Sequence, residues 1–174
     1  MPARGSCWLA VFLVALVAGS LVAQDRTAEL RSRFEKETDP VRKAHLVGQL
    51  ADAEFRNMHE KIDAGDLTAA EEIAGRVRDE AAASKKALDA KSRDPEAHPD
   101  GYKQLEISVR ESIRRLDDIM VSLAKDKQAP LAEVRKDLDE LDRQMIHQLF
   151  PKRPEAAPKA PVPPPEQPTQ HPKS

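Results

Sequence analysis

The segment from Tyr102 to Phe150 constrains the fold most, because two regular apolar rows follow one another in it. Each row has spacings of three and four residues, which place its members on one face of a helix. The rows are Leu105, Val109, Ile113, Leu116, Met120 and Leu123, then Leu131, Val134, Leu138, Leu141, Met145 and Leu149. The link KDKQAP separates them, and Pro130 suits the first turn of a new helix. The pattern predicts two helices that form an antiparallel hairpin.

Two helices are predicted near the start of the polar part of the chain. A short one covers residues 25–38, where Leu30 and Phe34 stand four residues apart. Asp39 can then accept the free N–H groups at the start of a second helix, and Pro40 fits its first position.

A third long helix is predicted after a turn at Gly65, which ends the second helix at about residue 64. Asp66 caps the new helix. Its apolar row is rich in alanine and consists of Leu67, Ala70, Ile73, Ala74, Val77, Ala81 and Leu88. The helix should end by Asp94, because the sequence RDPEAHPDGYK contains two prolines and a turn signal.

These elements predict an all-α fold, an antiparallel helical bundle of four long helices plus a short N-terminal helix, over residues 24–150. Residues 151–174 differ sharply in composition, since they hold nine of the 14 prolines. We expect this segment to be a disordered, proline-rich tail with polyproline II character.

The first 23 residues have the features of a secretory signal peptide. Positive charge at Arg4 precedes an apolar run over residues 8–18 and small residues up to Ala23, after which cleavage is expected. The alternative is an uncleaved membrane anchor, but the run is shorter than the ~20 residues of a spanning helix. Cys7 would leave with the signal, so the exported chain, periplasmic or extracellular, would contain no cysteine.

The segment AGDLTAAEEI resembles the turn between the helices of a tetratricopeptide repeat, with Gly65, Asp66, Leu67 and Ala70 in the matching places. No second copy follows at the 34-residue period of that repeat, so a local helix stop and cap explains it better.

The chain as a whole resembles an uncharacterised group of exported bacterial helical proteins. The resemblance rests on FEKETDPVRKAHL from Phe34, the AGDLTAAEEI turn, SRDPEAHPDGYKQLEISVRESIRRLDDI from Ser92, and the proline-rich end. It implies a helical fold and export, and it implies no activity.

Metal sites were sought among the histidines and in one acidic loop. The five histidines are scattered along the chain: His45, His59, His98, His147 and His171. His59-Glu60 lacks the second histidine of an HExxH motif. The loop with Asp94, Glu96, His98 and Asp100 fails as an EF-hand, because Ile107 stands where the closing glutamate belongs. We predict no metal ligand.

Catalytic motifs are also missing from the sequence: it has no glycine-rich phosphate loop, no GxSxG elbow and no Cys-His pair. Many charges stand four residues apart, as in helix surface pairs. These pairs are Glu29/Arg33, Glu72/Arg76, Glu106/Arg110, Glu111/Arg115 and Asp139/Arg143. We therefore predict no catalytic residue, no cofactor and no enzymatic activity.

The resulting hypothesis is a non-catalytic interaction or structural protein of the bacterial envelope or secreted fraction, with a protein partner. The alternative is a periplasmic bundle that senses a small ligand or a metal. Nucleic acid is not expected as a partner, because the net charge is −2 and no basic stripe is present. A homo-oligomer is compatible with the stripe from Leu131 to Leu149, which can close onto its own chain or onto another copy.

Overall fold

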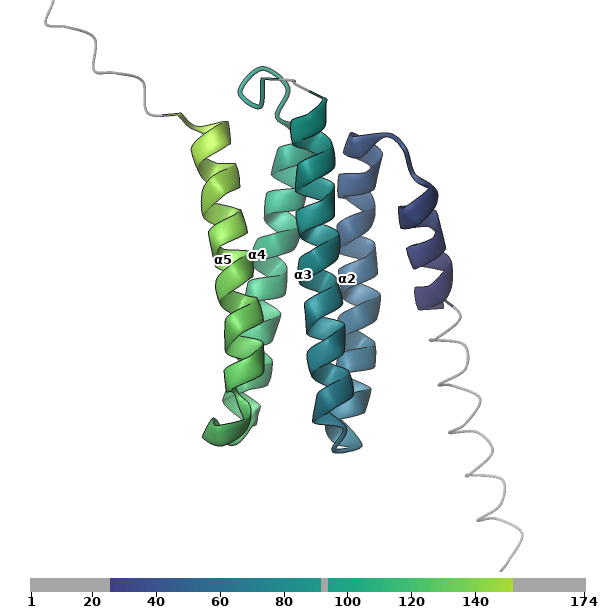
Figure 1. Ribbon diagram of the computed structural model, residues 1–174, viewed down its shortest axis with the longest axis vertical. Coiled ribbons are helices and arrows are strands. Elements are labelled where there is room, and N and C mark those ends of the chain that lie inside the picture. Colours follow the sequence, from purple (N-terminus) through teal and green to yellow (C-terminus); the bar gives the residue numbers. More distant parts are fainter. Residues whose placement is uncertain (1–25, 92–93, 152–174) are drawn as a thin grey trace, which may run out of the picture.

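The computed structural model describes residues 26–91 and 94–151, and five helices pack together in this part of the chain (Figure 1). The first covers residues 26–36. The others are α2 (Pro40–Asp63), α3 (Leu67–Ala90), α4 (Asp100–Ser122) and α5 (Ala129–Leu149), with the 3-10 turn η1 (Lys125–Lys127) before α5. These two ranges contain no strand, which confirms the all-α prediction. The predicted signal and the proline-rich segment beyond Pro151 lie outside the described residues.

The helix boundaries follow from local chemistry, as the sequence predicts. The Asp39 carboxylate accepts the N–H groups of Val41 and Arg42 at 3.0 Å each. The Asp66 carboxylate accepts the N–H of Ala69 at 3.1 Å. Gly65 ends α2 with a φ of 77°, a conformation that costs glycine little and other residues more. Both predicted caps and the glycine stop are confirmed.

Two predicted boundaries need correction. The first helix ends at residue 36, not 38, because the Glu37 side chain accepts the N–H of Asp39 at 2.8 Å and residues 37–39 leave the helical conformation. Helix α4 begins at Asp100, two residues before Tyr102. There Lys103 N–H already bonds to the carbonyl of Pro99 at 2.8 Å, and the acidic Asp100 suits a helix N-terminus.

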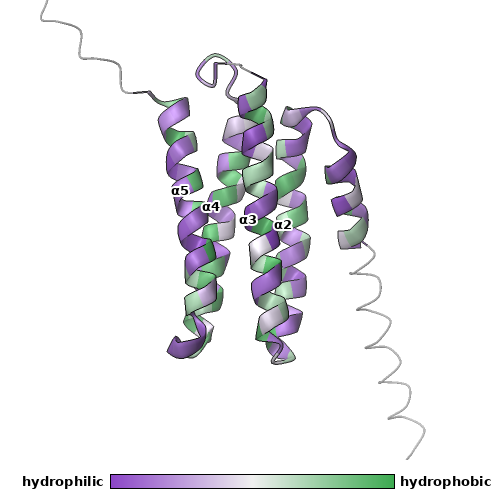
Figure 2. Ribbon diagram, viewed as in Figure 1, coloured by the Kyte–Doolittle hydropathy of each residue, from purple (hydrophilic) through white to green (hydrophobic). Residues whose placement is uncertain are grey.

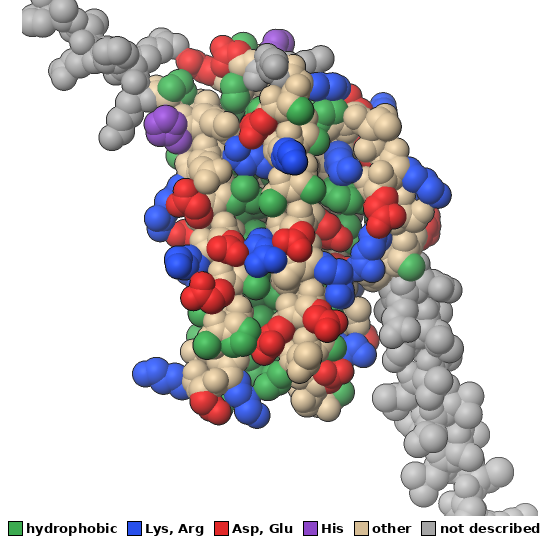
Figure 3. Space-filling model, viewed as in Figure 1, with side chains coloured by type: hydrophobic (Ala, Val, Ile, Leu, Met, Phe, Trp, Pro, Cys, Tyr) green, Lys and Arg blue, Asp and Glu red, His purple; other side chains and the backbone are tan. Residues whose placement is uncertain are grey.

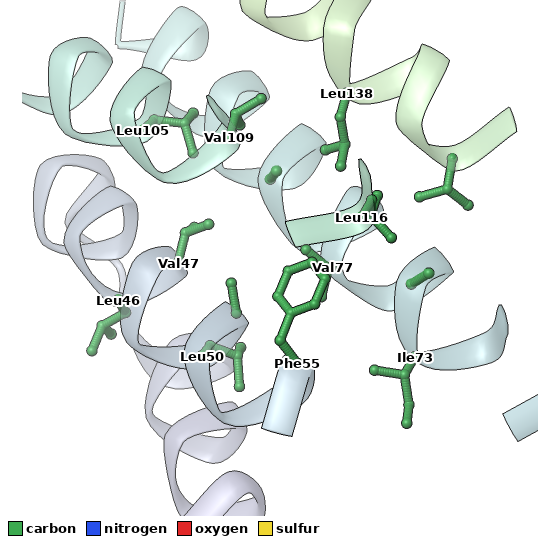
Figure 4. Close-up of a cluster of buried hydrophobic side chains, with 14 of the residues drawn as sticks. Leu46, Val47, Leu50, Phe55, Ile73, Val77, Leu105, Val109, Leu116 and Leu138 are labelled. Atoms are coloured by element: carbon green, nitrogen blue, oxygen red, sulfur yellow. The ribbon is translucent and has the colours of Figure 1, made fainter. Parts of the chain in front are cut away.

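Helix α2 packs along both α3 and α4 and also adjoins residues 26–36 (Figure 1), and α3 contacts all three of the other long helices. Helix α5 packs on α4 and α3. Figure 4 shows apolar side chains from α2, α3, α4 and α5 gathered between the helices. The innermost large side chains include Leu50, Phe55, Met58, Ile73, Leu105, Leu116, Leu138 and Met145.

Each long helix is amphipathic, and hydrophobic residues alternate with hydrophilic ones along it (Figure 2). Most members of the two predicted rows are buried, while Ile113, Met120, Leu123 and Leu141 are only partly buried at the edge of the core. On α4 the buried face is rotated toward α2, because Ser108 and Ser112 are buried as well. A Cβ on Gly48 of α2 would lie 2.9 Å from Ser108 Oγ, so these small residues allow a close helix approach.

Outside the core, acidic and basic side chains are interspersed on the visible face, over α5 and α3 (Figure 3). Within the two described ranges, none of the helices combines the length and the apolar character of a membrane span.

Candidate functional site

A carboxylate without solvent exposure, Glu54 on α2, lies where α2, α3 and residues 26–36 meet. Arg31 on the N-terminal helix forms an ion pair with Glu54 Oε1, and Arg76 Nη2 on α3 lies 3.4 Å from Oε2. The sequence places Arg76 in a surface pair with Glu72, and this interpretation is wrong for Arg76, because the helix packing turns it toward Glu54. Three helices are therefore joined through one buried carboxylate.

A second acidic residue, Glu80 on α3, completes what we call the Glu54 cluster: Arg31, Glu54, Arg76 and Glu80. Arg31 Nε lies 3.6 Å from Glu80 Oε1. Burial raises the pKa of Glu80 to about 7, and the negative charge of Glu54 adds to the rise, whereas Arg31 and Arg76 oppose it. The Glu54 cluster is neutral when all four groups are charged, and it gains a positive charge when Glu80 binds a proton.

Several polar atoms of this region are buried without a hydrogen-bond partner. They include the Nε atoms of Arg31 and Arg76 and, one turn along α2 from Glu54, the Oδ1 atom of Asn57. Sequence reasoning missed the cluster. The sequence does contain an indication of the cluster, because the acidic Glu54 stands inside the apolar row of α2. A carboxylate in such a row needs a charged or hydrogen-bonding partner. The apolar residues on the same face are Leu50, Ala51, Phe55 and Met58.

A shallow groove of about 410 Å³ runs between α2 and α4, and we call it the α2/α4 groove. Small residues form part of its lining: Gly48, Ala51, Ser108 and Ser112. Larger residues complete it: His45, Gln49, Asp52, Phe55, Gln104, Ile107, Glu111 and Arg115. The lining thus combines hydrogen-bonding groups with the apolar side chains of Ala51, Phe55 and Ile107.

Arg115 is held firmly in the α2/α4 groove. Its guanidinium lies 2.6 Å from Asp52 across the groove and 3.0 Å from Glu111 one turn before it on α4. The same group lies 5.6 Å from the centre of the Phe55 ring, within the range of a cation–π contact. The groove therefore presents a charge whose position is already fixed.

Ile107 stands at the edge of the α2/α4 groove with 57% of its surface exposed. The exposed part of this aliphatic side chain is available to another molecule. Val121 on the same helix is also exposed, at 86%, and it does not line this groove.

The residues considered as metal ligands are not brought together. His45 lines the α2/α4 groove. His59 lies exposed near the other end of α2, His98 and His147 lie exposed on other parts of the chain, and His171 is outside the described residues. Asp94 Oδ1 accepts the N–H of Glu96 at 3.0 Å, so this carboxylate shapes its own loop. In the part of the chain that the structure describes, no three His, Cys, Asp or Glu residues are grouped to hold a metal ion.

A polar contact fastens the start of α4 to the end of α3. The Tyr102 hydroxyl donates to Asp89 Oδ1 at 2.9 Å, and Lys85 Nζ lies 2.7 Å from Asp89 Oδ2. Burial, followed by the hydrogen bond to Asp89, raises the pKa of Tyr102 to about 12. The tyrosine stays protonated at physiological pH, so it acts as a fixed hydrogen-bond donor between two helices.

Comparison with known proteins finds no matching family model, no matching curated protein and no matching solved structure. The resemblance to exported bacterial helical proteins stays a prediction, and the proposals that follow depend on the geometry of this chain and on its sequence.

Proposed function

We propose that this chain is an exported, non-catalytic interaction protein that binds a protein partner in the bacterial envelope or secreted fraction. The observation that carries the proposal is the α2/α4 groove with the exposed Ile107 at its edge. In this account α2 to α5 form an antiparallel four-helix bundle, and residues 151–174 are a proline-rich spacer beside it.

The small residues of the groove favour a helix or an extended segment as the bound element. Gly48 and Ser108 bring the two helices close and leave little side-chain bulk between them, so a partner backbone can approach closely. Around them, Gln49 and Gln104 offer amide donors and acceptors. This lining supports a polar segment that forms hydrogen bonds in the groove.

Apolar contact and a fixed charge supply the specificity of the proposed site. Ile107 can bury its free surface under one apolar side chain of the partner, and such residues carry much of the free energy of an interface. Arg115 is already oriented by Asp52 and Glu111, so little side-chain entropy is lost when it contacts a partner. The partner segment should thus combine polar groups with one apolar residue.

A capture experiment tests the proposal. The chain from Gln24 to Ser174 is compared with Ile107→Glu and with Val121→Glu after crosslinking in envelope extract. A charge at residue 107 should abolish recovery of the partner, because it would be buried in the interface, whereas a charge at 121 should have no effect. Equal recovery with both variants would refute the groove as the binding surface.

A chain that ends at Phe150 separates the bundle from the tail. The proposal predicts that this shorter chain recovers the partner as well as the chain to Ser174. Recovery that requires residues 151–174 would assign binding to the proline-rich segment instead.

Export is tested separately. Deletion of residues 1–23 should keep the protein in the cytoplasm, since the apolar run over residues 8–18 supplies the signal. Unchanged export of the deleted chain would contradict the proposed localisation and would leave the groove proposal standing.

A further inference from the structure

The helix over residues 26–36 lies outside the four long helices, beside α2 (Figure 1). Its buried side chains are Thr27, Leu30 and Phe34, with exposed fractions of 6%, 8% and 5%. On one side Lys43 Nζ of α2 lies 4.5 Å from the centre of the Phe34 ring. On the other, Arg31 reaches the carboxylates of Glu54 and Glu80. A helix of this length is marginal on its own in water, so these contacts hold it in place.

Two features of the surface beneath this helix are formed without any residue of the helix. Helix α2 begins with its own cap, since Asp39 accepts the N–H groups of Val41 and Arg42. Glu54 would keep Arg76 as an ionic partner if Arg31 left. The release of residues 26–36 would therefore leave α2 capped and its buried carboxylate paired.

The surface is chemically selective. It offers the carboxylate of Glu54 from α2 and the side chain of Glu80 from α3, with Arg76 as the resident cation. An arginine that enters here forms an ion pair with Glu54 and favours the charged form of Glu80. Buried or half-buried carboxylates favour arginine over lysine, because the planar guanidinium can contact both at once.

We propose that this face of α2 and α3 is an exchangeable docking site for an arginine-bearing amphipathic helix, and that residues 26–36 of a second copy can occupy it in place of the chain's own helix. The second copy would contribute Arg31 to the Glu54 cluster. Residues 37–39 are the short connection that would have to open, and the exchange must break the hydrogen bonds that Glu37 accepts from Asp39 and Arg42. This site lies apart from the α2/α4 groove and does not depend on the proposed function.

A peptide binding assay tests the exchange. The probe is a fluorescent peptide of residues 24–38, and the receptor is the chain from Gln24 to Ser174 with Arg31→Ala and Phe34→Ala, which weaken the resident helix. Fluorescence anisotropy should show saturable binding to this receptor, and binding at least tenfold weaker to the unaltered chain, whose own helix competes.

Two altered peptides define the chemistry. An Arg31→Ala peptide should bind at least tenfold more weakly, because the Glu54 cluster would lack its second cation, whereas an Arg33→Ala peptide should bind like the original, since Arg33 is exposed. The absence of saturable binding to a folded receptor, or equal binding of the Arg31→Ala peptide, would overturn the proposal.

Hydrogen exchange on the unaltered chain keeps the proposal testable if the altered receptor does not fold. Amides of residues 27–36 should exchange at least tenfold faster than the central amides of α2 and α3, because the helix opens independently. If these amides exchange only as fast as the most protected amides of the molecule, the helix does not open by itself and the proposal is wrong.

Discussion

At the scale of single residues, Glu54 shows how a charged group is tolerated inside a helical protein. A carboxylate loses its hydration when it is buried, and this loss is offset only when cations and hydrogen bonds replace the water. Arg31 and Arg76 come from two different helices to do so. Both arginines keep about a third of their side-chain surface exposed, at 34% and 38%, so the positive charges are only partly dehydrated.

Replacing Glu54 by glutamine should destabilise the protein by about 2 kcal/mol. Breaking a fully buried ion pair usually costs ~3–5 kcal/mol. The cost should be smaller here because the two arginines can still reach solvent. Urea denaturation monitored by circular dichroism measures the change. Glu60→Gln on the exposed side of α2 is the matched control and should change the free energy of unfolding by less than about 0.5 kcal/mol. Equal stability of the two variants would show that the Glu54 cluster contributes nothing.

Glu80 should make the stability depend on pH. Its pKa is raised from 4.5 to about 7 in the folded protein, so the folded state binds a proton more tightly than the unfolded state. This contribution is fully present below about pH 4.5 and is lost as the pH rises through about 7. The Glu80→Gln variant lacks this titration, so only the natural chain loses the contribution as the pH rises. The free energy of unfolding of the variant minus that of the natural chain should therefore rise by on the order of 3 kcal/mol between pH 4 and pH 8.

Denaturation at several pH values measures this difference. Glu72→Gln changes an exposed carboxylate on the same helix and is the control. The difference in stability between Glu72→Gln and the natural chain should not rise comparably with pH. A constant difference between Glu80→Gln and the natural chain across the range would contradict the assigned environment of Glu80.

At the scale of the helices, the turn between α2 and α3 depends on one glycine. Gly65 has a φ of 77° with open space around it, whereas Gly75 lies within α3 and also has free space. Gly65→Ala should destabilise the protein by about 1 kcal/mol, because an L-residue is strained there. Gly75→Ala should stabilise it by about 0.8 kcal/mol through helix propensity. Thermal denaturation measures both, and effects of the same sign would contradict the described turn.

The elements were predictable from the sequence where local chemistry determines them. Asp39, Asp66 and Gly65 act within three residues of their own positions, so a sequence pattern contains all the needed information. The rotation of α4 was not predictable in this way. Ser108 is buried against Gly48, 60 positions earlier, where the absence of a side chain lets α2 approach, and a helical period does not contain that contact.

At the scale of the whole molecule, the assembly of helices creates both candidate sites. The Glu54 cluster draws its residues from three helices, and the α2/α4 groove draws its lining from two. Apart from Glu54, which interrupts an apolar row, the sequence shows these residues as ordinary members of amphipathic helices. Arg76 illustrates the difficulty, because Glu72 stands at the right spacing for a surface pair while the packing turns the arginine to Glu54.

The surface as a whole carries both signs of charge in close mixture (Figure 3). Many of these charges are paired within the molecule, and pairs such as Arg135 with Asp117, at 2.7 Å, link neighbouring helices. An exposed pair of this kind contributes little to stability. The feature that distinguishes the α2/α4 groove is therefore the exposed apolar Ile107 in a lining that also contains the fixed Arg115.

The most direct test of the proposed function is site-specific photocrosslinking in intact cells. A photoreactive amino acid is placed at residue 107 in one chain and at residue 121 in another, two exposed apolar positions on α4. If the α2/α4 groove binds a protein partner, a discrete crosslinked species should form from position 107 and should be absent from position 121. The same products from both positions, or no product from position 107, would contradict the account.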